Sequence, residues 1–211
     1  MSDFLPLFPL KLVVFPGEEL NLHIFEPRYK QLIRECDENG ITFGIPAFID
    51  NKVMDFGTEL ELLSITKKYE TGEMDIMTKG IGVFRLKEFY THLSDKLYSG
   101  ADIHRLEIQK EGDNDLYKKI LDLLEEMYAI IKVESKHPKD PHNFDCYEIG
   151  HHLGMSIDQE YALLCKPSEF ERQQFVLDHL NKMIPVVKNI EAMKAKVKMN
   201  GHFKKLLPPN F

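Results

Sequence analysis

The periodicity of the apolar residues changes near residue 112, and this change constrains the fold more than any other feature of the sequence. Before it, apolar residues form short runs or alternate with polar ones, which is typical of half-buried β-strands; one example is Leu20, Leu22 and Ile24. After it they recur at helical spacing, first at Leu116, Ile120, Leu123, Leu124, Met127 and Ile131. The sequence therefore predicts an α+β chain, with a β-rich subdomain over 1–111 and a helical subdomain over 112–211.

Turn-forming residues divide the first subdomain into several short strands. Prolines interrupt the opening runs, including Leu12–Phe15, so these are expected to be edge strands or strand starts, because proline cannot donate to the ladder. Pro27 suits the first turn of a helix near 27–38 that Asn39-Gly40 would end. Further strands are expected at 41–49, from about 60, on both sides of a hairpin connection at 70–73, at 81–90 and at 98–110. This order predicts a small, mostly antiparallel barrel with one inserted helix.

The second subdomain is predicted to be a helical bundle that ends in a long helix. Its first helix would end at the polar stretch His137–Asn143, and a short helix would cover about 144–153. Two pairs have capping-box spacing and each predicts a helix start: Ser156 with Gln159, and Ser168 with Glu171. Pro185 is expected to kink the last helix, whose candidate core positions are Phe175, Leu180, Ile184, Val187 and Ile190.

Charge and cysteine content narrow the partners and the compartment. The formal net charge of -7 disfavours nucleic acid, because phosphate repels an acidic chain that lacks a dominant basic patch. Cys36, Cys146 and Cys165 lie far apart and form no CxxC pair, which indicates reduced, structural cysteines in the cytoplasm. The start of the chain has no basic region, and no run of about 18 apolar residues occurs, so neither a signal peptide nor a membrane span is expected.

Several motifs near the start of the chain combine proline, glycine and apolar residues in a fixed order: Leu5-Pro6-Leu7-Phe8-Pro9-Leu10, Val13-Val14-Phe15-Pro16-Gly17, Leu20-Asn21-Leu22 and Ile24-Phe25-Glu26-Pro27-Arg28-Tyr29. This opening resembles the N-terminal domain of Lon proteases, in the form seen in stand-alone Lon-domain proteins. Phe56-Gly57-Thr58 is also similar to the family, as is the segment from Gly80 to Leu86, where Val83 replaces a common arginine. Glu171-Arg172-Gln173-Gln174 resembles the helical half more weakly.

The resemblance implies a PUA-like β-barrel followed by a helical bundle. It also implies recognition of unfolded or tagged polypeptide instead of cleavage, in a bacterial protein without ATPase or peptidase modules. The motif itself identifies a scaffold more than a site, since prolines in edge strands chiefly prevent uncontrolled strand pairing.

The sequence contains no complete motif of an ATPase or of a serine hydrolase. Gly40–Gly44 is followed by Ile45-Pro46 where a phosphate-binding loop requires Gly-Lys, and no G-x-S-x-G elbow occurs. Glu148 and His151 share a helix face and could ligate a metal together, but an exposed polar face is the favoured interpretation. A lone Cys146 is more often a small buried hydrophobe than a nucleophile. We therefore expect a non-enzymatic protein with no cofactor and no metal site.

The candidate binding residues surround a predicted loop at 50–52, where exposed apolar side chains suggest a contact surface: Phe48, Ile49, Val53, Met54 and Phe56. The expected partner is an unfolded or client polypeptide, with a protease or chaperone as a possible associate. The alternative for these residues is structural, as a plug of the barrel end or of the junction with the helices.

Two other functions remain open from the sequence. Six lysines at 188, 194, 196, 198, 204 and 205 could contact RNA, as some PUA-like folds do, although Phe203 is the only aromatic residue among them. Lysines near a helix C-terminus are also stabilised by the macrodipole, which favours a solvated helix end. The third interpretation is a small-molecule binder or hydrolase in the cleft between the subdomains.

Overall fold

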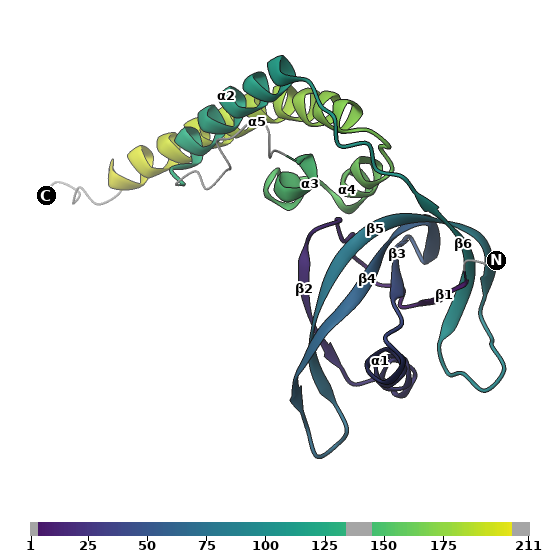
Figure 1. Cartoon of the computed structure of the whole chain (residues 1–211). Helices are drawn as coiled ribbons and strands as arrows, with labels where there is room; N and C mark the ends of the chain where they lie inside the picture. The colour runs from purple at the N-terminus through teal and green to yellow at the C-terminus, as the bar shows by residue number, and fades with distance from the viewer. Residues whose placement is uncertain (1–3, 134–144, 204–211) are drawn as a thin grey trace, which may run out of the picture. The chain divides into compact units, whose positions relative to one another are not determined.

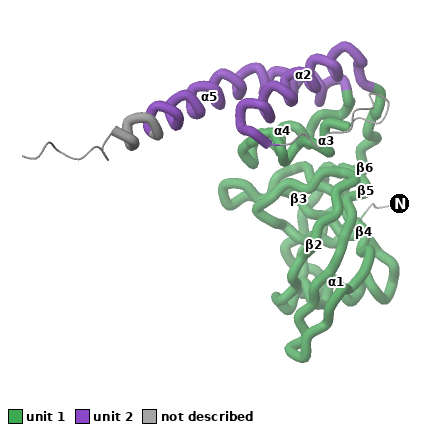
Figure 2. The backbone as a smooth tube through the Cα atoms, turned by 90° about the vertical axis from the view of Figure 1, so that its left-hand side faces the viewer, with its two compact units in different colours: residues 1–111, 145–169 green, residues 112–144, 170–211 purple. Residues whose placement is uncertain are grey.

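Figure 1 shows the computed structural model of the chain, which describes residues 4–133 and 145–203. The chain forms two compact units, distinguished by colour in Figure 2. Unit 1 comprises Met1–Glu111 and Asp145–Glu169, and unit 2 comprises Gly112–Phe144 and Phe170–Phe211. The chain thus leaves unit 1 near residue 112, where the apolar periodicity changes from strand-like to helical. It returns to unit 1 for the helical segment 145–169. The division into separate domains at 111/112 stays a prediction.

Unit 1 is built on one six-stranded sheet that closes on itself. Its strands are β1 (Phe4–Leu7), β2 (Glu19–Ile24), β3 (Phe43–Ile49), β4 (Lys52–Lys68), β5 (Met74–Tyr90) and β6 (Ser99–Leu106), in the order β2-β5-β4-β3-β1-β6. Because β6 also pairs with β5, five strands form a ring, and β2 extends it along the first half of β5. Every pairing is antiparallel except β1 with β3. The expected mixed α+β fold with a mostly antiparallel barrel is confirmed.

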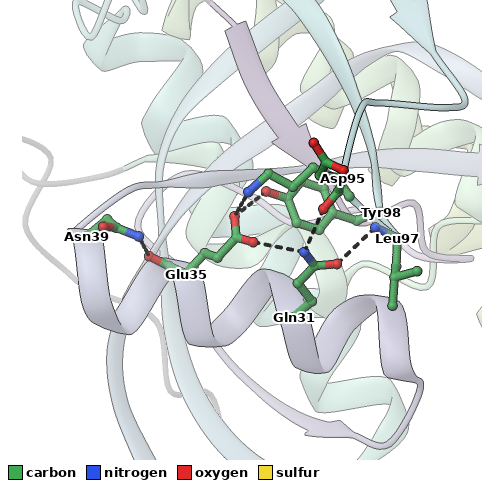
Figure 3. Close-up of polar contacts among 7 residues, drawn as sticks. Gln31, Glu35, Asn39, Asp95, Leu97 and Tyr98 are labelled. Atoms are coloured by element: carbon green, nitrogen blue, oxygen red, sulfur yellow. Dashed lines mark hydrogen bonds and ion pairs between the residues drawn. The ribbon is translucent and has the colours of Figure 1, made fainter.

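The inserted helix α1 (Pro27–Asn39) lies where the sequence predicts it, with Pro27 in its first turn and Gly40 in the left-handed region after it (φ 63°). Its buried face, which includes Leu32 and Ile33, joins the main apolar cluster of the unit. Figure 3 shows its polar face, where Glu35 accepts hydrogen bonds from Tyr98 (2.5 Å) and Lys96 (2.7 Å). Burial tends to raise the pKa of Glu35, but these bonds outweigh it and hold the pKa below its usual value. The helix is therefore fixed to the β5–β6 loop by charge-assisted bonds.

Two glycines of the family-like motifs are required by close packing. A Cβ on Gly57 would lie 2.6 Å from the carbonyl oxygen of Ile45 and 2.6 Å from the ring of Phe84, and one on Gly80 would lie 2.5 Å from the carbonyl oxygen of Phe15. These distances are shorter than van der Waals contact, so a larger residue would displace backbone. Gly57 therefore allows β4 to pack closely on β3 and on Phe84, and Gly80 allows β5 to pack closely on the segment before β2.

Three strand predictions needed correction. Leu12–Phe15 is not a strand, although Val13, Val14 and Phe15 are buried, because the prolines turn the backbone away from the ladder while the side chains stay in the core. The strand expected from about 60 begins at Lys52, since the connection before it is only two residues long. The return strand after 73 and the strand at 81–90 are one element, β5.

Residues 145–169 add short helices to unit 1: α3 (Cys146–Ile149), the 3₁₀ turn η2 (Gly150–His152) and α4 (Ile157–Leu164). The predicted capping box is present at the start of α4, where Ser156 and Gln159 bond reciprocally. Tyr147 donates from its hydroxyl to the carbonyl of Leu164 (3.1 Å), which ties α3 to the end of α4.

Unit 2 contains α2 (Asn114–Ile131) and most of α5 (Glu169–Phe203), which lie side by side (Figures 1 and 2). Asp113 caps α2, and its backbone N–H donates to Gln173 of α5 (2.7 Å). Leu180 and Ile184 are buried as predicted, whereas Ile190 is 47 % exposed. The helix continues through Pro185, and the break predicted at His137–Asn143 lies outside the described residues.

Candidate functional site

The five candidate residues lie on a tight hairpin between β3 and β4. Asp50 and Asn51 form its turn with positive φ values of 48° and 61°, the geometry of a two-residue hairpin connection. The predicted loop is therefore a two-residue turn, and Val53, Met54 and Phe56 are strand residues. Because side chains alternate across a strand, these three do not share one face.

Phe48 and Val53 lie directly opposite each other in the β3–β4 register, and both are half-buried. Both line a pocket of about 360 Å³, together with Pro9, Arg28, Tyr29, Phe89, Thr91 and Ser99. Arg28 is the one charged member of this group. We call this the rim pocket; most of its lining is apolar, so it suits an apolar side chain.

The other three candidates do not belong to the rim pocket. Ile49 is 7 % exposed and therefore belongs to the core. Phe56 packs edge-to-face on Tyr161 of α4 with centroids 6.4 Å apart, and its backbone N–H donates to the Tyr161 hydroxyl (3.2 Å). Met54 is half-buried and, by strand alternation, on the same face as Phe56. The residues of the hairpin therefore have two different surroundings: Phe48 and Val53 line the rim pocket, whereas Phe56 packs against α4.

Aromatic stacking makes one wall of the rim pocket rigid. The Tyr29 ring stacks on Phe8 with centroids 3.7 Å apart, and the Arg28 guanidinium lies 4.4 Å from the Tyr29 centroid. Arg28 also pairs with Glu26 (2.8 Å). Burial raises the pKa of Tyr29, so its hydroxyl stays protonated at neutral pH.

Sequence reasoning missed most of the rim pocket. Arg28 and Tyr29 were part of a family-like motif, so the resemblance could have indicated them. Phe89, Thr91 and Ser99 carried no such signal, because they meet Phe48 only through the closure of β5 and β6.

A larger cleft of about 910 Å³ lies elsewhere in unit 1 and has a mixed, charged lining that includes Glu18, Glu61, Lys79, Tyr147, Glu148 and His151. Its size exceeds that of the rim pocket, but its polarity does not match an apolar client. His151 is held there between Glu18 (3.2 Å) and Glu160 (2.8 Å). The bond to Glu18 is the main cause that raises the pKa of His151 to about 9, against an opposing effect of burial.

These contacts also describe the residues weighed for metal binding and catalysis. His151 directs its two ring nitrogens at Glu18 and Glu160 instead of sharing a ligand with Glu148. Within 4–133 and 145–203, no three His, Cys, Asp or Glu residues are grouped so that they could hold a metal ion. The Cys146 side chain is fully buried, which fits the structural role expected for it.

Comparison with models of known protein families identifies the family of the chain. The model of the ATP-dependent protease La (LON) substrate-binding domain matches residues 4–182. The chain belongs to this LON substrate-binding domain family. The match extends through the barrel and the returning helices into α5, so the family relationship includes parts of both units.

Solved structures with the same fold come from the same family of domains. A Lon N-terminal domain protein from Xanthomonas campestris is 21% identical, with a TM-score of 0.64, and the match covers 83% of this chain and 97% of that one. The N-terminal domain of the Mycobacterium avium complex Lon protease is 11% identical, with a TM-score of 0.60, and the match covers 84% and 98%. These LON domains share the fold with the chain described above. No helix among its described residues is both long and apolar enough to cross a membrane.

Proposed function

We propose that this LON-domain chain is a non-catalytic module that binds segments of unfolded or client polypeptide at the rim pocket. The observation that supports the proposal is an apolar pocket, lined by Phe48 and Val53, in a member of a substrate-binding family. An unfolded polypeptide exposes apolar side chains that a native protein buries, so an open apolar pocket on a rigid wall discriminates between the two states.

The stacked wall of the pocket would supply affinity at low entropic cost. Tyr29 is already held by Phe8 and Arg28, so little freedom is lost when a ligand side chain packs against it. Arg28 lies at the edge of the pocket, where a carbonyl or carboxylate of the ligand would share its guanidinium with Glu26. We further propose that the chain acts in the cytoplasm as an adaptor or regulator for a protease or chaperone.

The test compares Phe48→Ser with one control substitution on β4, the other strand of the hairpin. Phe48→Ser should weaken binding of reduced, carboxymethylated α-lactalbumin by about tenfold or more, because one apolar side chain contributes about 1–3 kcal/mol at an interface. Its melting temperature should change little, since Phe48 is only half-buried. Leu63→Ser, at a 43 % exposed position of β4 outside the pocket, should change neither quantity. Binding is measured by fluorescence anisotropy and melting by circular dichroism.

Each alternative gives a different result. If Phe48→Ser lowers the melting temperature sharply, the side chain belongs to the core and the rim pocket is not the site. If neither quantity changes, client polypeptide binds elsewhere. If the wild-type chain does not bind reduced α-lactalbumin at all, the polypeptide-binding module itself is contradicted.

The RNA-binding alternative gains no support from the described residues. Lys188 pairs with Glu126 (2.5 Å) and Lys194 with Glu191 (2.6 Å), so part of the lysine charge is already balanced. Lys204 and Lys205 lie outside the described residues.

A further inference from the structure

The last turns of α5 carry an exposed apolar stripe. Val186, Ile190, Met193 and Val197 are 48 %, 47 %, 67 % and 70 % exposed. At 100° per residue these four side chains fall within one narrow sector of the helix, separate from the sector of the buried Ile184. Earlier in α5 the same sector is buried, at Arg172 and His179, so the exposed stripe begins only at Val186. The stripe is therefore a continuous exposed surface and not a set of scattered apolar residues.

The spacing within the stripe is that of a helix-packing seam. Its four residues are separated by four, three and four positions, the alternation that places side chains on a single line facing a partner helix. This spacing continues for about three turns, which matches a short amphipathic helix better than an extended peptide.

The borders of the stripe are basic. The same helical geometry places Lys182 and Lys196 along one border and Lys194 along the other. Residues 182–198 contain five lysines and one glutamate, in a chain whose net charge is -7. Within the described part of the chain, Lys182 and Lys196 form no ion pair, so their charge is available to a partner.

We propose that this stripe docks an amphipathic α-helix of a partner protein whose own apolar seam is bordered by acidic residues. The apolar seam supplies the buried area, and Lys182 and Lys196 pair with acidic residues at the flanking positions. A second copy of the chain fits less well, because lysine borders would face lysine borders in either orientation. An anionic membrane fits less well too, because the seam is narrow and has no aromatic residue. This docking surface is independent of the rim pocket.

The test uses two synthetic helical heptad peptides as probes, with Ile and Leu in the seam of both and with Glu or Lys at the flanking positions. The intact chain should bind the Glu-flanked peptide at least about tenfold more tightly than the Lys-flanked one, and raised salt should reduce the difference. Ile190→Ser should weaken binding of the Glu-flanked peptide by about tenfold. Val133→Ser, at a 54 % exposed position at the end of α2, is the matched control and should leave it unchanged.

Three results would overturn the proposal. One is equal binding of both peptides, or binding that Ile190→Ser does not alter. Another is a dimer of the chain alone, seen by sedimentation and lost in Ile190→Ser, which would assign the stripe to a second copy. The last is retention on phosphatidylserine vesicles, or on poly(U) RNA, that is lost in the same variant. Both substitutions, Ile190→Ser and Val133→Ser, are at exposed positions, so they should leave the fold intact. The comparison of the two peptides uses the wild-type chain alone.

Discussion

At the scale of single residues, His151 makes contacts with two carboxylates of unit 1, those of Glu18 and Glu160. It joins the turn after α3 to Glu18, which precedes β2 and also accepts a hydrogen bond from the backbone N–H of Phe15 (2.9 Å). The ring also lies 4.7 Å from that of Phe15. The stabilisation depends on the charged imidazolium, because the hydrogen bonds to both carboxylates favour the protonated form.

The pKa of His151, about 9, fixes the sign of the pH dependence. A folded-state pKa above the unfolded value of 6.5 contributes stability that is complete below about pH 6.5 and is lost as the pH rises through about 9. Glu18→Gln should therefore lower the pKa of His151 toward 6.5, measured by NMR titration of the ring protons.

Glu148→Gln is the matched control for this substitution, since the structure gives no bond between Glu148 and His151. It should leave the titration of His151 nearly unchanged. A pKa that stays near 9 in Glu18→Gln would contradict the assignment of Glu18 as the main cause.

At the scale of elements, the β3–β4 turn determines how Phe48 and Val53 meet. A two-residue turn with both residues in the left-handed region matches the twist of the strands it joins, and it fixes the register that places these side chains opposite each other. Asp50 and Asn51 tolerate this region better than most residues, but glycine adopts it without a Cβ penalty.

Asn51→Gly should therefore stabilise the chain by about 0.5 kcal/mol, whereas Asn51→Val should destabilise it by more than about 1 kcal/mol. The free energy of unfolding is measured in urea. Thr71→Gly, in the other hairpin connection and without a positive φ, should not stabilise. Equal effects of Gly at both positions would show that the left-handed geometry of the turn is not the cause.

At the scale of the whole molecule, the two units present different kinds of surface. Unit 1 carries the rim pocket and the charged cleft, and unit 2 carries the apolar stripe of α5. A chain with these surfaces is suited to binding polypeptide at one place and a folded partner at another, as the adaptor role proposed above requires.

The whole molecule is also expected to lack catalysis. The purified chain should release no phosphate from ATP and should not cleave fluorescein-labelled casein, because its sequence has no phosphate-binding loop and its Cys146 is buried without the exposed, activated geometry of a nucleophile. Activity above a mock-purified control, lost in Cys146→Ala or His151→Gln, would contradict this expectation.

The sequence by itself determined the elements that depend on local patterning. Pro27 and Asn39-Gly40 predicted the bounds of α1, and Ser156 with Gln159 predicted the start of α4, because caps and turns are decided by residues close together in the chain. The ordered prolines and glycines of the opening also indicated the family. The later family-like motifs include Gly57 and Gly80, which fill positions that admit no side chain.

Only the tertiary structure decided where the candidate binding residues lie. Phe48 and Val53 line a pocket, whereas Ile49 is core and Phe56 meets α4, because strand alternation and ring closure assign neighbouring residues to different surroundings. The same holds for 145–169, whose helical pattern gave no sign that the segment returns to the barrel unit. Periodicity reports which residues avoid water, but contacts between distant segments determine which other residues they meet.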